Sequence, residues 1–369
     1  MKKAKHLISV DDFSSEEIEI VFSLAKKIKH APQTYKGALG GCMFGLIFEK
    51  PSTRTWVSFE VGIQTMGGGT IYLGPEDIRL GVREAVQDVA RVLERYLDGV
   101  ILRTFAHETI TTFERYFHKP VINGLSDFEH PCQALADLFT IREKFKDPKK
   151  PVLAFVGDGN NVLNSLLLLT AKLGGRLRYA TPSDFSPSPE VIQKANAQAK
   201  KSGAVIESFR DPREAVKGAD FVYTDVWVSM GEEKKKKSKV LSFGGFQVNR
   251  ELLRHASKDV KIMHCLPAHR GEEITDDVLE GDASIVFDQA ENRLHVQKAV
   301  LVHLCTYGEG NEKDRSRIFW WFGYFMRRSL AQGTIRGGSG VFLRIPRRGT
   351  QSHGSSKARF RGRGQAYLY

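Results

Sequence analysis

Short apolar runs alternate with amphipathic stretches along most of this chain. Runs of apolar and β-branched residues, each bounded by polar turns, are typical of buried strands. They lie at 43–48, 98–103, 120–123, 152–157, 219–225, 261–265 and 283–288. Helix-like segments lie between them, near 54–66, 84–96, 131–145, 162–173, 188–201 and 272–280. Alternation of this kind predicts an α/β fold with parallel sheets and helices on both faces.

The pattern divides the chain into two doubly wound parallel-sheet domains joined by helices. The first domain is expected over 1–145, where Ser14 to Glu17 form a capping box that opens its first helix. A charged, proline-containing stretch at 144–151 is interpreted as a hinge, and the second domain is expected over 146–290. A helix within 291–306 is expected to return to the first domain. Residues 307–369 form a basic tail with no clear pattern of elements.

The net charge of +12 would suggest a nucleic-acid partner, but its distribution argues against one. From residue 311 onward the chain has 13 Lys and Arg against two Asp and Glu, so the tail holds 11 of the 12 net charges. The body is therefore nearly neutral, and no nucleic-acid partner is expected.

The spacing of the cysteines and the hydropathy of the chain indicate the cellular location expected for the protein. The four cysteines, Cys42, Cys132, Cys265 and Cys305, are widely spaced, which favours a reducing cytoplasm and argues against a structural metal site. No stretch of about eighteen apolar residues is present, so no membrane partner is expected. The basic start MKKAKHLISVDDF lacks the apolar run of a secretory signal.

The segment FEKPSTRTWVSFE at 48–60 carries the strongest chemical signal. Hydroxyls, an arginine and free backbone N–H groups at a predicted helix N-terminus together suit a phosphate group, to which the helix dipole adds. A simple helix cap is the alternative, because Ser and Thr are common at that position.

Three further motifs follow predicted strands or open predicted helices. In EHPCQALADL (129–138), His130 and Gln133 share one helix face, and both can donate hydrogen bonds to a carbonyl oxygen. In DVWVSMG (225–231), Asp225 can pair with an ammonium group, and in HCLPAHRGEE (264–273), Cys265 ends a strand. Each alone is as well explained by packing or by a polar loop. GDGNNVLNS (157–165) lacks the full G-x-G-x-x-G pattern, so NAD binding is disfavoured.

Taken together, these motifs resemble those of ornithine carbamoyltransferases in order and spacing. The resemblance rests on STRT, HPCQALADL, GDGNN, DVWVSMG, HCLPAHRGEE and ENRLHVQKA and covers roughly residues 5–305. The related aspartate enzymes share STRT and HPxQ but not DxWxSMG followed by HCLPxHRG. The resemblance implies transfer of a carbamoyl group from carbamoyl phosphate to the δ-amine of L-ornithine, giving L-citrulline in arginine biosynthesis. It also implies a homotrimer or a multiple of one, and no cofactor or metal.

The resemblance also assigns residues to two binding sites. The carbamoyl phosphate site would comprise Ser52, Thr53, Arg54, Thr55, Arg79, Arg103, His130, Gln133, Cys265, Leu266 and Arg293. Arg103, His130, Gln133, Cys265 and Arg293 are the expected catalytic residues, and Thr55, Arg103, His130 and Gln133 would face the carbamoyl oxygen. Leu125, Asn161, Asp225, Ser229 and Met230 would bind ornithine. Loss of one donor to the developing oxyanion typically costs ~3 kcal/mol.

The chain departs from the family pattern at three positions. Trp56 replaces the second arginine of STRTR, which predicts weaker carbamoyl phosphate binding or a compensating repack. Arg79 stands where relatives have Gln or His reaching a neighbouring subunit's site, and we expect it to supply positive charge there. Val89 stands where Thr is usual.

The tail continues for about sixty residues beyond the point where the resemblance ends. RGG-like pieces such as 359–364 would favour RNA binding. Back-translation favours another interpretation. One base later, permitted codons for 311–325 encode MKKIVLAYSGGLDTS, and those for 333–342 encode ERYGGEVVF. The first string resembles the start of argininosuccinate synthase, so the tail is interpreted as non-native, out-of-frame read-through.

Several alternatives remain open at this point. The acceptor could be putrescine or a modified ornithine, although Asp225, Ser229 and Met230 favour free ornithine. The chain could be a catalytically impaired relative, or an RNA-binding protein acting through its tail. The catabolic direction, from citrulline and phosphate, is not excluded by the residues.

Overall fold

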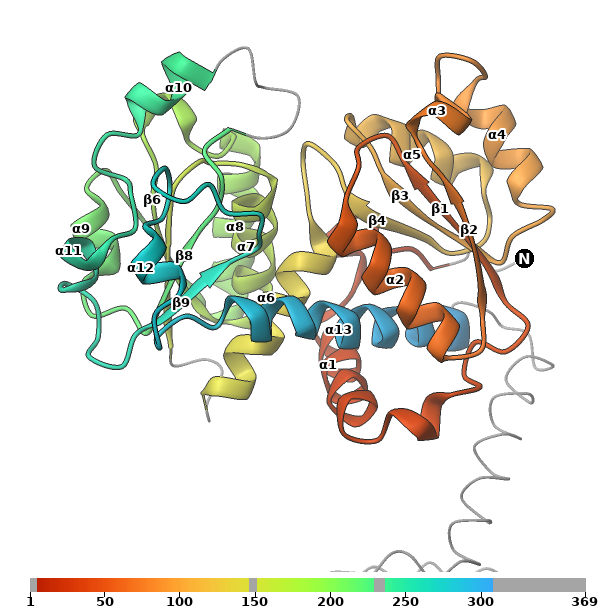
Figure 1. Cartoon of the computed structure of the whole chain (residues 1–369), viewed down its shortest axis with the longest axis horizontal. Coiled ribbons are helices and arrows are strands. Elements are labelled where there is room, and N and C mark those ends of the chain that lie inside the picture. The colour runs from red at the N-terminus through yellow and green to blue at the C-terminus, as the bar shows by residue number, and fades with distance from the viewer. Residues whose placement is uncertain (1–4, 146–150, 229–235, 308–369) are drawn as a thin grey trace, which may run out of the picture. The chain divides into compact units, whose positions relative to one another are not determined.

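The computed structural model describes residues 5–145, 151–228 and 236–307, and all of them fall within one unit spanning Met1–Phe322. The hinge interpreted at 144–151 falls largely outside these ranges, as do Ser229, Met230 and the tail from 308 onward. Two parallel sheets organise the described part of the chain (Figure 1). The expected fold class, two parallel-sheet α/β domains, is confirmed.

The first sheet has four strands in the order β2–β1–β3–β4, all parallel. Its strands are β1 (Met43–Phe48), β2 (Gly69–Leu73), β3 (Gly99–Arg103) and β4 (Val121–Leu125). The helical elements of this region are η1 (Val10–Asp12), α1 (Ser15–His30), η2 (Pro32–Tyr35), α2 (Thr53–Thr65), α3 (Pro75–Ile78), α4 (Val86–Leu93), α5 (His107–Tyr116) and α6 (Pro131–Lys144). The expected capping box is present, since Ser14 and Glu17 cap α1 reciprocally.

The second sheet has five strands in the order β7–β6–β5–β8–β9, again all parallel. Its strands are β5 (Val152–Val156), β6 (Arg176–Ala180), β7 (Val205–Phe209), β8 (Phe221–Thr224) and β9 (Lys261–His264). The accompanying helices are α7 (Asn161–Leu173), η3 (Ser183–Phe185), α8 (Pro189–Ser202), α9 (Pro212–Val216), α10 (Lys236–Ser242), α11 (Arg250–Leu253), α12 (Asp276–Leu279) and α13 (Val286–Tyr307).

The sequence pattern placed one element wrongly and missed several others, including the helices α5, α9, α10 and α11. The strand predicted over 283–288 is wrong, because Ser284 makes only a single bridge to Ile262 and α13 begins at Val286. Strands β2, β6 and β7 were not predicted. No residue of β2 or β7 is fully buried, β6 begins with an exposed residue, and β6 and β7 carry charged side chains.

Helix α13 links the two sheets. It packs against α1, α2 and α6, which accompany the first sheet, and it also contacts β9 of the second (Figure 1). One apolar core runs through this junction and includes Phe48, Phe155, Leu166 and Leu301, all fully buried. Among the described residues, no helix is long and apolar enough to cross a membrane.

Candidate active site

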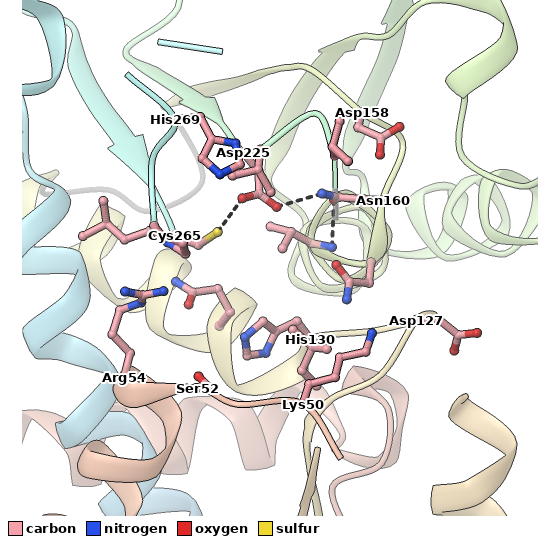
Figure 2. A pocket seen from close by; sticks show the side chains of 18 of the residues that line it. Lys50, Ser52, Arg54, Asp127, His130, Asp158, Asn160, Asp225, Cys265 and His269 are labelled. Carbon is pink, nitrogen blue, oxygen red and sulfur yellow. Dashed lines mark hydrogen bonds between the residues drawn. The ribbon is translucent and has the colours of Figure 1, made fainter. Parts of the chain in front are cut away.

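A pocket of about 820 Å³ lies where carboxyl ends of strands from both sheets meet. The end of β3 and the loops after β1 and β4 supply one wall, and loops after β5, β6, β8 and β9 supply the other (Figure 2). The predicted site residues that line it are Ser52, Thr53, Arg54, Arg103, Leu125, His130, Gln133, Asn161, Asp225, Cys265, Leu266 and Arg293. Motifs separated by more than two hundred residues therefore share one cavity.

The start of α2 forms one wall of the pocket. Ser52 is the N-cap, and its hydroxyl accepts a hydrogen bond from the Thr55 N–H at 3.3 Å. The cap leaves other N–H groups of the first turn without helical partners, and the helix dipole adds positive potential. Arg54 projects from this turn toward the pocket (Figure 2). This arrangement suits an anionic group such as phosphate.

Three guanidinium groups line the same part of the cavity. Arg103, at the end of β3, is 5% exposed, and Arg293 of α13 is 3% exposed. No ion pair of Arg54, Arg103 or Arg293 occurs within the described ranges, and the Nε atoms of Arg103 and Arg293 are buried without a partner. Burial and the charges of Arg293 and Arg54 lower the pKa of Arg103 to about 10. The wall thus holds concentrated positive charge that an anion would neutralise.

Thr55 lies behind this wall. It is fully buried, does not line the pocket, and accepts a hydrogen bond from Arg293 Nη2 at 2.8 Å. Its hydroxyl therefore holds a guanidinium group in place.

His130 is a neutral imidazole at the base of the pocket (Figure 2). Burial and the nearby charges of Arg293, Arg103 and Arg54 hold its pKa well below the usual value. Its Nδ1 is buried without a partner, and its backbone N–H donates to Ser165 Oγ at 2.9 Å. A neutral histidine carries one N–H and can donate one hydrogen bond to a substrate oxygen.

Gln133 is held differently from the sequence expectation. It is 1% exposed, and its Nε2 donates to Asp137 Oδ1 at 2.8 Å. Its Oε1 is buried and has no partner. The uncommitted end of this amide therefore includes a hydrogen-bond acceptor, whereas the sequence suggested a donor to a carbonyl oxygen.

The opposite wall is built around Asp225, at the end of β8. Figure 2 shows its carboxylate between two donors: Cys265 Sγ donates to Oδ1 at 2.9 Å, and Asn160 Nδ2 donates to Oδ2 at 2.7 Å. Burial, together with the adjacent Asp225 carboxylate, raises the pKa of the Cys265 thiol well above its usual value. Cys265 is thus a protonated donor and a poor nucleophile.

Asn160 positions this wall and was not singled out from the sequence. Its Oδ1 caps α7 by accepting the N–H groups of Val162 and Leu163, while its Nδ2 reaches Asp225. The preceding Gly159 has no room for a side chain, since a Cβ there would come within 2.4 Å of the Pro187 nitrogen. The close approach of this backbone explains why glycine precedes the cap.

Side chains at the start of α7 also form hydrogen bonds with the backbone of the loop after β4. Asn161, Asn164 and Ser165 share one face of the helix at spacings of three and four. They bind successive backbone groups of that loop: the Ser126 oxygen (2.5 Å), the Phe128 oxygen (3.0 Å) and the His130 nitrogen (2.9 Å). The predicted ornithine residue Asn161 therefore lines the pocket while its amide is engaged by the opposite wall.

The loop after β9 is braced by a buried histidine. His264 Nδ1 accepts the Leu266 N–H at 2.8 Å, so Nε2 carries the proton and donates to Glu273 Oε1 at 3.0 Å. The Leu266–Pro267 peptide bond is cis. These contacts fix the backbone on either side of Cys265.

A metal could in principle use Asp225, His264 and Cys265, whose ligand atoms lie within 4.8 Å of one another. Their chemistry does not favour this, because both ring nitrogens of His264 are engaged and the Cys265 thiol is protonated.

Other predicted residues lie elsewhere. Arg79 does not line its own chain's pocket and forms an ion pair with Glu76 at 2.9 Å. Ser229 and Met230 are outside the described residues. Trp56 is 38% exposed and stacks on Tyr72, with ring centroids 4.5 Å apart.

Sequence reasoning also missed several residues of the pocket lining. Lys50 is 7% exposed and lies over the Phe105 ring at 4.5 Å. Lys239 of α10 forms a buried ion pair with Asp158 at 2.7 Å. Lys50 stood inside the quoted FEKPSTRT segment, whereas the partner of Lys239 lies 81 residues away and no local pattern reveals it.

Comparisons with known proteins agree with this geometry. Residues 5–143 match the family model described as aspartate/ornithine carbamoyltransferase, carbamoyl-P binding domain, and residues 149–304 match the Asp/Orn binding domain. The ornithine carbamoyltransferase of Archaeoglobus fulgidus is 50% identical over 304 residues, which cover 81% of this chain and 97% of that protein.

Solved structures give the same result. The ornithine carbamoyltransferase of Pyrococcus furiosus superposes with a TM-score of 0.78 at 46% identity, covering 82% of this chain and 97% of that one. The anabolic enzyme of Campylobacter jejuni gives 0.77 at 42% identity, covering 81% and 98%. The chain belongs to the aspartate/ornithine carbamoyltransferase family.

Proposed function

We propose that this chain is an anabolic ornithine carbamoyltransferase, which joins carbamoyl phosphate and L-ornithine to give L-citrulline and phosphate. The observation that supports this most directly is the pairing of two unlike walls in one pocket. Arg54, Arg103 and Arg293 offer positive charge on one side, and Asp225 offers a carboxylate on the other. An acyl phosphate and an ammonium-bearing amino acid match these walls in charge.

The phosphate group would bind at the start of α2. Ser52, Thr53 and the backbone N–H groups of the first turn supply hydrogen bonds, and Arg54 with Arg103 supplies charge. Arg293 is held by Thr55 and completes the anion site from α13.

The carbamoyl group would lie beside His130 and Gln133. Neutral His130 and Arg103 donate to the carbonyl oxygen and stabilise the negative charge that develops on it. The buried Oε1 of Gln133 accepts a hydrogen bond from the carbamoyl NH₂ group. Leu266 and Cys265 close this part of the pocket.

Ornithine would bind against the wall of Asp225, with Asn161 and Leu125 beside it. Ser229 and Met230 belong to this part of the proposal on the family resemblance alone. The δ-ammonium must first release a proton to solvent, because only the free amine has a lone pair. The amine nitrogen then bonds to the carbamoyl carbon, and the bond from that carbon to the phosphate oxygen breaks. The departing phosphate can take the proton that the nitrogen releases.

Citrulline formation is the decisive assay. Purified full-length chain should convert carbamoyl phosphate and ornithine to citrulline, with little product from putrescine or aspartate. Putrescine lacks the α-carboxylate, and aspartate lacks the δ-amine. Equal or better turnover of putrescine would contradict the assignment of ornithine.

The proposal includes a homotrimer or a multiple of it. The exposed apolar side chains on α2 and β2, Trp56, Val57, Val61 and Ile71, are suited to contact a second copy. Arg79, at the end of α3, would then reach the neighbouring phosphate site. Light scattering gives the mass of the assembly, and unaltered carbamoyl phosphate affinity in Arg79→Ala would contradict this role.

A cytoplasmic location and a non-functional tail complete the proposal. The four cysteines are free thiols, as a reducing compartment favours. The tail, residues 307–369, is proposed to be out-of-frame read-through with no role in catalysis. The nucleotide sequence tests this, since codons incompatible with the second frame would contradict it. Salt-dependent RNA binding, lost on deleting 311–369, would point to a function for the tail.

A further inference from the structure

Asp137 is a buried acceptor that the proposed mechanism does not use. It is fully buried in α6, one turn after Gln133. Its Oδ1 accepts two amide N–H groups, one from Gln133 at 2.8 Å and one from Gln289 of α13 at 2.6 Å. The other end of the Gln289 amide accepts the backbone N–H of His264 at 3.0 Å. Each amide in this chain of contacts therefore has a defined orientation.

The orientation of Gln133 matters because of what surrounds it. Arg103, Arg293 and His130 line the same region, and a neutral His130 and the guanidinium groups present N–H donors. Donors suit a phosphate and a carbonyl oxygen, but not the NH₂ group of a carbamoyl phosphate. The buried Oε1 of Gln133 is an acceptor without a partner in the described structure, and such an atom marks a place where a ligand completes the hydrogen bonding.

A rotated amide would reverse this chemistry. If Gln133 turned its NH₂ end away from Asp137, its oxygen would meet a carboxylate, and like partial charges would repel. Asp137 thus favours one of the two amide orientations. Burial raises the pKa of Asp137 to about 7, but a proton on Oδ2 would leave Oδ1 able to accept both amides. A neutral Asp137 with its proton on Oδ2 therefore holds Gln133 in the same orientation as the carboxylate does.

We propose that Asp137 is a positioning residue that fixes the Gln133 amide with its oxygen toward the carbamoyl NH₂ group, and so sets the preference for carbamoyl phosphate over acetyl phosphate. The two acyl phosphates are nearly the same size, and acetyl phosphate has a methyl group in place of the NH₂ group. Acetyl phosphate would leave Oε1 buried and unsatisfied. This inference rests on the proposed carbamoyl transfer and names the feature of the donor that the site recognises.

The test compares the two acyl phosphates in one assay. Citrulline formation gives KM for carbamoyl phosphate, and its inhibition by acetyl phosphate gives Ki, for the wild type, Asp137→Leu and Asp137→Asn. Asp137→Leu removes the acceptor at similar size, so the ratio of Ki to KM should fall by about tenfold or more. Asp137→Asn can keep an oxygen at the Oδ1 position and should retain the wild-type ratio.

The outcomes separate the possible explanations. An unchanged ratio in an active Asp137→Leu protein would overturn the inference, because a purely structural role weakens both ligands alike. If that variant does not fold, Gln133→Met removes the proposed acceptor directly, and an unchanged ratio there overturns it as well. A wild-type protein that makes no citrulline would refute the proposed function instead.

Discussion

On the wall formed by the first sheet, Arg103 and Arg293 each bury an Nε atom that has no partner. On the facing wall, Asp225 already receives hydrogen bonds from Cys265 and Asn160. The first wall gains stabilising contacts when an anion arrives, whereas the second must exchange existing contacts for new ones. On the proposed function, affinity for the phosphate-bearing substrate is therefore prepared in the fold, whereas binding of the amine requires rearrangement of existing hydrogen bonds.

Removing one guanidinium should give the largest effect. Arg103→Gln is expected to lower kcat/KM for carbamoyl phosphate by about a hundredfold to a thousandfold, because a charged donor to the developing oxyanion is lost. Steady-state kinetics at saturating ornithine measure this. A decrease in kcat/KM of less than about fivefold would contradict the proposed difference between the walls.

The same variant tests whether the uncompensated charge of the first wall lowers the stability of the ligand-free protein. An uncompensated buried charge destabilises a fold, so Arg103→Gln without ligand should melt no lower than the wild type. Inorganic phosphate should raise the melting temperature of the wild type clearly more than that of the variant. A variant that melts much lower, yet is stabilised equally by phosphate, would mean that Arg103 is a structural residue.

The second wall should respond selectively to Asp225→Asn. The change keeps the shape but removes the charge that pairs with an ammonium group, so KM for ornithine should rise by about tenfold to a hundredfold. KM for carbamoyl phosphate should stay within about twofold, because the first wall is intact. Equal changes in both constants would show that the walls do not act separately.

Asp137, at the junction between the walls, should make the stability of the protein depend on pH. Burial raises the pKa of Asp137 to about 7, above its unfolded value near 3.8, so the folded state binds the proton more tightly. Stability that this proton provides is lost as pH rises from about 4 to 7. Asp137→Asn should therefore gain on the order of 2 kcal/mol over the wild type at pH 8 relative to pH 5. Urea unfolding at both values measures this, and a pH-independent difference would contradict it.

The smallest effect is expected at Trp56, outside both walls. Its ring is 38% exposed and stacks on Tyr72, so the lost arginine has been replaced by a packed aromatic pair. Trp56→Arg should cost about 1 kcal/mol of stability. It should change KM for carbamoyl phosphate by less than about threefold. A larger gain in affinity for carbamoyl phosphate would instead support the expectation that Trp56 weakens its binding.

The sequence predicted the strands whose ends carry the site, and with them twelve of the residues that line the pocket. Central strands such as β1 and β5 are apolar throughout, so their pattern is local and clear. The strands β6 and β7 were missed because Arg178 and Glu207 pair across them at 3.0 Å, which places charge where an apolar pattern is sought.

Side-chain contacts between residues that are far apart in the sequence are the part of the site that could not be predicted. Gln289 and Asp137 are 152 residues apart, and no local pattern indicates that their side chains meet. Gln133 Nε2 likewise donates to Asp137, and the motif that contains both residues reveals only that they share a helix. Residue types were readable from the motifs, but the orientation of each polar group depends on the packed structure.

Helix α13 carries Gln289 and Arg293 near its start, packs against α1, α2 and α6, and ends at Tyr307. At 1.5 Å per residue, about 20 Å of helix separates Arg293 from that end. Fraying of α13 from Tyr307, or proteolysis within the helix near that residue, would consume this length before reaching the guanidinium group. Catalytic turnover would therefore fall only after extensive loss of this end of the helix. Measurements of intact mass or hydrogen exchange would detect the loss sooner.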